Sequence, residues 1–196
     1  ICGGSAIAAV GPVLKADDHE MAVSLGVIFI LNAIALFIFP LIGHYFEMSQ
    51  AQFGTWAAIA IHDTSSVVGA GDAYGREACE IATLIKCTRA LWIIPLAFAT
   101  MFVFRDKSGS KIAIPWFIFL FVLAMVINTY CGIPAAVSDM IVYISKKALV
   151  VTLFFIGAGL SLSMVKKVGV RPLLLAVLLW IIIGMGSFFV VMETIA

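Results

Sequence analysis

The residues Val150 to Met164, VVTLFFIGAGLSLSM, are the stretch that decides the fold of this chain. The stretch begins as an apolar run typical of a membrane helix and then meets Gly157, Gly159 and Ser161. A glycine in a helix interior costs roughly 1 kcal/mol relative to alanine, and serine is a preferred residue at the start of a helix. The pattern therefore predicts a helix that breaks in mid-membrane and a second helix that begins near Ser161.

The first residues of the chain repeat this pattern. Gly3, Gly4 and Ser5 precede the apolar residues of a predicted half-helix over residues 5–14. Two hydrophobic segments interrupted in corresponding places indicate the binding site of a secondary transporter. Half-helices that begin near Ser5 and Ser161 would direct free N–H groups and positive dipole ends toward the membrane centre. Alternatively, the glycines only allow neighbouring helices to pack closely.

The composition places the chain in a membrane. Of its 196 residues, 63% are hydrophobic and 12% are charged, whereas soluble domains carry about 25% charged residues. With about 20 apolar residues for each span, the chain has room for about seven segments, some of them short or broken. The net charge of +1 and the absence of a basic stripe in the sequence exclude a nucleic-acid partner. The four cysteines lack metal-ligand spacing, so we expect neither a metal nor another cofactor.

A polar stretch separates two apolar runs in the first half of the chain. Residues 62–66, HDTSS, follow the apolar residues 53–61, which are too few to span a bilayer. Non-helical backbone at membrane depth is tolerated only where protein or a water-filled cavity surrounds it, so we expect a hairpin-like or broken segment. Histidine titrates near neutral pH, and His62 with Asp63 would form a proton-linked or gating element. The alternative is a mutually satisfied pair that only stabilises irregular backbone.

Two basic residues lie inside the next predicted helix, residues 82–104. Lys86 and Arg89 are three residues apart and therefore share one helix face. Ionisable residues inside a membrane are candidates for a functional site, and these two would line a cavity and attract an anion. Alternatively, their long side chains reach the membrane surface.

Uninterrupted spans are expected at three places, residues 21–39, 115–130 and 173–191. Pro40, Gly43 and His44 are expected to mark the far end of the first of them. The basic loops at residues 105–111 and 166–171 would both be cytoplasmic, because positively charged loops stay on that side of the membrane.

The order of these motifs resembles the UPF0324 or YeiH-like proteins, a bacterial membrane family that carries the label of sulfate exporters. The resemblance rests on residues 1–6 (ICGGSA) with 12–16 (PVLKA), His62 with 67–71 (VVGAG), Lys86 with Arg89 and Pro95, and 157–160 (GAGL) with 172–175 (PLLL). It covers nearly the whole chain. It implies an all-α integral membrane protein of the bacterial inner (cell) membrane, a multi-span helical bundle with discontinuous crossed helices of the inverted-repeat transporter type.

The resemblance also implies how the chain is divided. Members of the family are longer at the N-terminus, and this chain begins with Ile, so we expect the C-terminal part of a longer polypeptide. Residues 1–44 would end the first repeat, residues 45–52 would connect, and residues 53–196 would form the second repeat. The expected partners are a small anion, the lipid bilayer and the missing N-terminal part of the same protein; a homodimer is left open.

The resulting hypothesis is a secondary transporter of a small anion, sulfate or a related oxyanion or organosulfur anion, without enzyme activity. A neutral cradle would come from Gly3, Gly4, Ser5, Gly157, Gly159 and Ser161, and positive charge from Lys86 and Arg89. Coupling to H⁺ or Na⁺ is left open. The alternatives are a passive channel or structural membrane subunit, and an intramembrane hydrolase with Ser5 as nucleophile and His62 as base.

Overall fold

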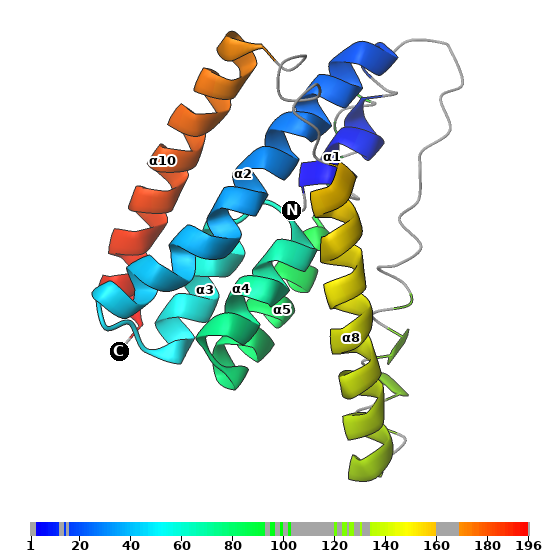
Figure 1. Ribbon diagram of the computed structural model, residues 1–196, viewed down its shortest axis with the longest axis vertical. Coiled ribbons are helices and arrows are strands. Elements are labelled where there is room, and N and C mark those ends of the chain that lie inside the picture. Colours follow the sequence, from blue (N-terminus) through cyan, green and yellow to red (C-terminus); the bar gives the residue numbers. More distant parts are fainter. Residues whose placement is uncertain are drawn as a thin grey trace.

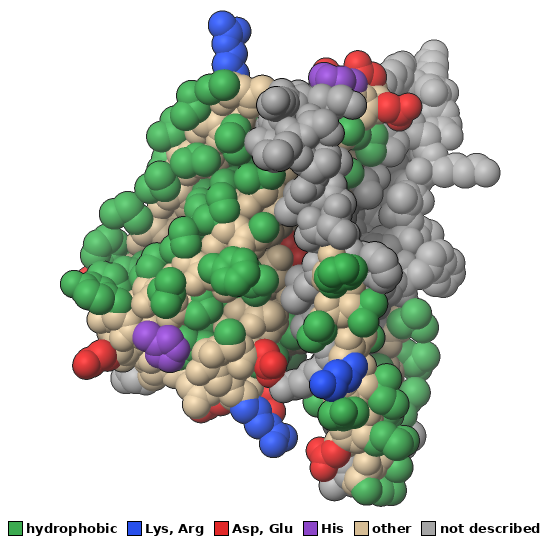
Figure 2. All heavy atoms as spheres, in the orientation of Figure 1, with side chains coloured by type: hydrophobic (Ala, Val, Ile, Leu, Met, Phe, Trp, Pro, Cys, Tyr) green, Lys and Arg blue, Asp and Glu red, His purple; other side chains and the backbone are tan. Residues whose placement is uncertain are grey.

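The computed structural model describes the chain in several ranges and is helical throughout its regular elements. The described residues are 3–11, 14, 16–92, 95–96, 99, 102, 120, 123–124, 126–127, 130, 134–159 and 169–195. The helices are α1 (Gly3–Val10), α2 (Asp18–Tyr45), α3 (Gln50–Ala60), α4 (Thr64–Tyr74), α5 (Arg76–Ala90), α8 (Ala135–Gly159) and α10 (Val170–Thr194). Among them, α2 and α10 are long and apolar enough to cross a membrane. Hydrophobic side chains cover the face that these two helices form (Figure 2).

Helix α2 is the axis against which the other helices can be placed (Figure 1). It begins with a capping box, in which Asp17 Oδ1 accepts from the Glu20 N–H at 2.7 Å and the Asp17 N–H donates to Glu20 Oε2 at 3.2 Å. The far end predicted at Pro40, Gly43 and His44 is confirmed, because α2 ends at Tyr45, although Pro40 itself lies inside the helix. Proline is tolerated in membrane helices where neighbouring helices support the interrupted backbone, and the turns flanking Pro40 pack against α3.

Helices α3 and α4 form a re-entrant hairpin whose open ends both lie at the Tyr45 end of α2. The rings of Phe53 in α3 and Tyr74 in α4 stack with centroids 3.9 Å apart. Both rings lie against Gly43 of α2, where an added Cβ would come within 2.5 Å of Phe53 and 2.8 Å of Tyr74. The hairpin therefore enters and leaves on the same side, which confirms the hairpin-like segment that the sequence predicted.

Helix α5 begins at the base of this hairpin and runs back toward its tip. Gln50 of α3 caps the start of α5, because its Oε1 accepts from the N–H groups of Glu77 and Ala78 at 3.0 and 3.2 Å. Small side chains are completely buried where the three helices meet, namely Ala57, Ala58, Ala60, Ala70, Ala78 and Ala82. Small residues let helix backbones approach closely in membranes, so α3, α4 and α5 form one tightly packed unit.

Helix α10 lies beside α2 and runs in the same direction (Figure 1). Near its start, Val177 packs against Val27 and Leu31. Near its end, the ring of Phe188 lies 4.9 Å from that of Phe46, just beyond α2. The contacts advance together along both helices, so α2 and α10 are parallel.

This parallel pair bears on the predicted inverted repeats. The last helices of repeats spanning residues 1–44 and 53–196 would be α2 and α10, and inverted repeats place equivalent helices antiparallel. The hairpin explains the difference, because it adds no crossing of the membrane between the two helices. The division into two repeats with these bounds stays a prediction, and the α2–α10 pair does not support it.

Helix α8 contains the stretch that opened the sequence analysis. It is continuous through Gly157 and extends to Gly159, so the helix does not break before that residue. Residues 160–168, and with them the second half-helix expected near Ser161, lie outside the described residues. The long helix predicted over residues 82–104 is wrong in its bounds, because α5 begins at Arg76 and ends at Ala90, and a turn follows at Leu91 and Trp92. Most of the span predicted over residues 115–130 lies outside the described residues.

The start of α8 lies at the base of the hairpin. The pKa of the exposed Arg76 guanidinium is raised first by its hydrogen bond and charge interaction with Glu80, at 3.0 Å, and further by Asp139 of α8. Helix α8 also contacts α4. Hence α8 begins on the side from which α5 begins.

Candidate functional site

The tip of the hairpin, Ile61-His62-Asp63, lies halfway along α2. The His62 N–H donates to Asn32 Oδ1 at 3.0 Å. Asn32 is 14 residues from Asp18 and 13 residues from Tyr45 within α2, or about 20 Å from each end at 1.5 Å per residue. Because α2 is long enough to span a bilayer, the tip is placed at mid-membrane depth.

The carbonyl end of α3 is held by side chains from two other helices. Lys86 Nζ donates to Ile61 O and, at 3.4 Å, to Ala58 O. Arg89 Nη1 donates to the same Ala58 oxygen at 3.2 Å, and Trp180 Nε1 of α10 donates to Ala60 O at 3.0 Å. The last carbonyls of a helix have no partner within the helix, so these three side chains supply donors that water cannot supply at this depth.

Lys86 and Arg89 therefore both point at the negative end of a helix dipole. Lys86 is only 1% exposed, whereas Arg89 is half-buried. Neither side chain reaches toward the membrane surface through these bonds. The prediction that the two residues share one helix face is confirmed. The structure adds their acceptors, the carbonyl oxygens at the end of α3, which the spacing alone does not reveal.

Asp63 begins the second arm of the hairpin. Its Oδ2 accepts from the Ser66 N–H at 2.9 Å and from the Ser66 hydroxyl at 3.1 Å. A carboxylate at this position satisfies an N–H group of the first turn and interacts favourably with the positive end of α4. His62 is half-buried at the tip, and its main chain, with N–H to Asn32 and C=O to Gly3, is fully engaged.

Helix α1 meets the tip with its N-terminus. The Gly3 N–H donates to His62 O at 2.7 Å. A Cβ at Gly3 would lie 2.6 Å from Ile28 Cδ1, so glycine permits this close approach. Gly4 lies against Leu25 and Gly11 against Met21, which shows that α1 runs antiparallel to α2, away from mid-depth.

The structure does not test the predicted pair of helix breaks. Gly3 of α1 donates its N–H to His62 at the hairpin tip, and Lys86 and Arg89 bind the end of α3 at the same tip. The Ser5 backbone lies in the first turn of α1, but its side chain and Ser161 lie outside the described residues. Gly157 and Gly159 lie in the last turn of α8, and the cradle of six residues stays a prediction.

Asn32 is a site residue that the sequence reasoning did not include. It was visible as the strongly polar residue of an otherwise apolar span, which is the signal that could have identified it. Trp180 was also missed, because a tryptophan in an apolar helix gives no indication that its indole N–H reaches a carbonyl on a distant helix.

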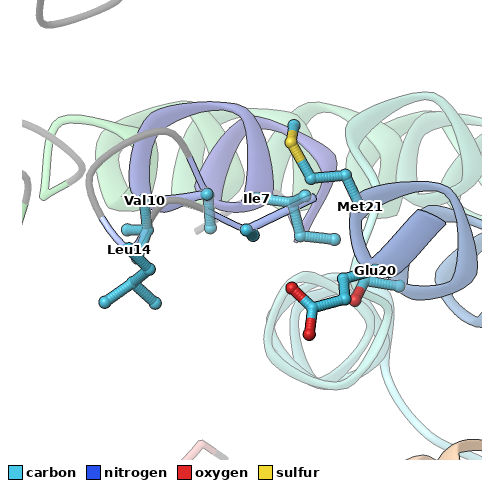
Figure 3. A pocket seen from close by; sticks show the side chains of 9 residues that line it. Ile7, Val10, Leu14, Glu20 and Met21 are labelled. Carbon is cyan, nitrogen blue, oxygen red and sulfur yellow. The ribbon is translucent and has the colours of Figure 1, made fainter. Parts of the chain in front are cut away.

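A separate apolar cleft of about 330 Å³ lies at the other end of α1. Figure 3 shows Ile7 and Val10 of α1, with Leu14 beyond them, facing Met21 and Glu20 of α2 across the opening. Glu20 also closes the capping box of α2. The cleft offers few polar groups and does not include the hairpin tip, so the tip is the better candidate for a polar ligand.

Comparison with known proteins identifies the family. A family model described as Conserved hypothetical protein 698 matches residues 1–176. The chain belongs to this family, the UPF0324 membrane proteins. A UPF0324 membrane protein of Bacteroides thetaiotaomicron is 65% identical over 192 residues, which are 95% of this chain and 57% of that protein. The UPF0324 protein of Porphyromonas gingivalis is 56% identical, with 95% and 57% covered.

A third UPF0324 membrane protein, from Photobacterium profundum, is 52% identical over 100% of this chain and 60% of its own length. The chain thus spans about three-fifths of the UPF0324 relatives that it matches. These relatives are bacterial membrane proteins, in agreement with the two membrane-spanning helices. No solved structure matches the chain.

Proposed function

We propose that the full-length UPF0324 protein to which this chain belongs is a secondary transporter of a small oxyanion such as sulfate, in the bacterial inner membrane. The observation that carries the proposal is the meeting of helix ends at mid-depth. Helix α3 ends there and α4 begins there, and Gly3 of α1 donates its N–H to the turn between them. Interrupted helices at the bilayer centre are the common device by which transporters bind ions and small solutes.

The charges around the tip favour an anion. Two cationic side chains, Lys86 and Arg89, approach it from α5, and one carboxylate, Asp63, lies beside it. Charges at this depth cost several kcal/mol unless they are paired or functional. A solute with negative charge would offset the surplus positive charge.

The hydrogen bonds and the burial of Lys86 and Arg89 differ, and we therefore assign them different roles. Lys86 is buried and holds the carbonyls of Ile61 and Ala58, so it positions the tip. Arg89 is half-buried and uses one guanidinium N–H on Ala58 O among the described residues. A guanidinium presents five donors in a planar fork that matches the oxygens of an oxyanion. We therefore assign anion binding to Arg89 and positioning to Lys86.

Alternating access would arise from movement of one group of helices relative to another around this site. The N-terminal part found in the longer relatives would complete the bundle, and coupling to H⁺ remains open. A passive channel at the same site is the competing proposal, because the same helix ends could line a pore.

Transport in proteoliposomes that contain the full-length protein tests the proposal. We expect saturable uptake of labelled sulfate or thiosulfate, reduced at least about tenfold by Arg89→Gln, because a charge-assisted hydrogen bond contributes about 1.5–3 kcal/mol. Arg76→Gln, which removes an exposed arginine paired with Glu80, is the matched control and should transport like the wild type. The absence of flux for any oxyanion in either gradient direction rejects the proposal, and a current that does not saturate favours the channel.

A further inference from the structure

The buried side-chain amide of Asn32 has a hydrogen-bond partner at its oxygen and none at its nitrogen. The residue is 3% exposed. Its Oδ1 accepts from the His62 N–H at 3.0 Å, which fixes the orientation of the amide. Its Nδ2 has no hydrogen-bond partner and is the buried side-chain polar atom in this condition within the described part of the chain. A buried donor without an acceptor costs about as much as a lost hydrogen bond and calls for an explanation.

The position of this amide relative to Lys86 and Arg89 points to a ligand. Asn32 holds the N–H of His62, and Lys86 holds the carbonyl oxygen of the same peptide, Ile61 O. Arg89 Nη1 donates to Ala58 O at 3.2 Å, one turn earlier in α3. The unsatisfied amide donor of Asn32 and the two cationic side chains therefore converge on the same end of α3, at the hairpin tip.

We propose that Asn32 Nδ2 is a binding group for the transported oxyanion, which it would hold together with Arg89 at the hairpin tip. The inference rests on the proposed function and deepens it by naming a ligand-binding residue on α2. The amide has two roles in this account: its oxygen anchors the hairpin tip, and its N–H₂ group donates to an oxygen of the substrate.

The donor chemistry also indicates the class of substrate. An amide N–H₂ group and the guanidinium of Arg89 are donors with fixed directions. Such donors suit an oxyanion, whose oxygens accept hydrogen bonds in several directions, and a site built from them discriminates strongly by hydrogen-bonding pattern. We therefore expect sulfate and thiosulfate to be preferred over chloride.

The two roles can be separated by one substitution. Asn32→Asp keeps an oxygen that accepts from the His62 N–H but replaces the N–H₂ donor with a second oxygen. Asn32→Leu removes both roles. Gln52→Glu is the control at the base of the hairpin, because the Gln52 oxygen also accepts a main-chain N–H, at 2.8 Å from Ser49; the variant loses the bond from Nε2 to Ile195 O and should melt lower, but it should keep the sulfate response.

The experiment uses the purified full-length protein and potassium sulfate, with potassium chloride as the reference salt. Melting temperature and sulfate flux are measured for the wild type and the three variants. We expect sulfate to raise the melting temperature of the wild type and of Gln52→Glu. We expect Asn32→Asp to melt lower than the wild type without sulfate, because a buried carboxylate is costly at this depth, to lose the sulfate response, and to show about ten- to hundredfold weaker apparent affinity in flux. Asn32→Leu should melt lower in both salts.

Three results would overturn the inference, and they can be told apart. If Asn32→Asp retains the sulfate response and the flux, the transporter proposal stands but Nδ2 does not contact the anion. If Asn32→Leu melts lower but keeps the sulfate response and the flux, the amide is only a structural anchor. If the wild type neither responds to nor transports an oxyanion, the proposed function fails and this inference fails with it.

Discussion

Lys86 of α5 donates a hydrogen bond to the carbonyl oxygen of Ile61, the last residue before the hairpin tip. Its ammonium group is buried and also reaches Ala58 O at 3.4 Å. A positive charge at the carbonyl end of a helix is favourable because it opposes the negative end of the dipole. These two hydrogen bonds explain why a lysine is tolerated in a buried position at membrane depth.

Replacing Lys86 should destabilise the protein strongly. Lys86→Met keeps most of the side-chain volume but leaves the carbonyl of Ile61 without this donor, at about 1–3 kcal/mol for the unsatisfied group, whereas Ala58 O keeps its bond from Arg89. Thermal and denaturant unfolding in detergent should show the loss. Lys147→Met, at an exposed position of α8, is the control and should change stability by less than about 0.5 kcal/mol. Equal stability of the two variants would contradict the capping role of Lys86.

Sodium ions should not be needed at the carbonyl end of α3. In cation-coupled transporters, exposed carbonyls at helix breaks coordinate Na⁺, but here the ammonium group of Lys86 takes that position. We expect the melting temperature of the full-length protein to be the same in sodium chloride and in choline chloride. A stabilisation that saturates with Na⁺ and is absent with choline would show that a metal ion binds there.

The packing of α2 on the hairpin predicts opposite effects for two glycine substitutions. Gly43→Ala should destabilise by about 1–3 kcal/mol, because the added methyl group meets the rings of Phe53 and Tyr74. Gly184→Ala on α10 meets nothing within 4 Å, and it should be neutral or stabilising by up to about 1 kcal/mol, because alanine is the better helix former. Unfolding measurements on both variants decide this, and a similar loss in both would be evidence against the hairpin packing.

The indole of Trp180 should contribute a measurable hydrogen bond. Trp180→Phe retains an aromatic ring next to Phe39, with which Trp180 stacks at 5.7 Å, but it removes the bond to Ala60 O. We expect a loss of about 0.5–1.5 kcal/mol plus a term for the smaller ring. The exposed Trp92 provides the control, since Trp92→Phe should lie within about 0.5 kcal/mol of the wild type. If the two losses are alike, the bond to α10 is not significant.

The re-entrant hairpin predicts a specific pattern of labelling from outside the membrane. In a background without native cysteines, cysteines at Glu47 and Arg76 should react with a membrane-impermeant thiol reagent from the same side. Cysteines at Asp18 and Arg171 should react from the opposite side, because α2 and α10 both begin there. If position 47 and position 76 are labelled from opposite sides, the segment between them crosses the bilayer and the hairpin is wrong.

The sequence predicted those elements that are determined by neighbouring residues in the chain. The polar residues after Ile61 interrupt an apolar run, and this interruption identified the hairpin tip. Glycines before an apolar run identified the half-helix that the structure describes as α1. Pro40, Gly43 and His44 identified the end of α2, and Pro40 can lie inside the helix because neighbouring helices pack around it.

Features that depend on distant partners could not be predicted. Spacing placed Lys86 and Arg89 on one face of α5, but their acceptors lie on α3, 25 to 31 residues earlier. Asn32 bonds to His62 30 residues later, and Trp180 reaches Ala60 across 120 residues. No periodicity in the sequence encodes these pairs, because they follow from the direction in which the hairpin re-enters.

Three side-chain hydrogen bonds, spread over the length of α3, join this helix to the C-terminal part of the chain. Gln52 Nε2 donates to Ile195 O at 2.7 Å, Trp56 Nε1 donates to Gly184 O at 2.9 Å, and Ala60 O receives the indole of Trp180. These bonds fix α3 to the membrane-crossing helix α10 near both ends and in the middle, so the two helices should move as one rigid body. In the proposed transport cycle, the first arm of the hairpin would stay fixed to α10, and α1 would move relative to both.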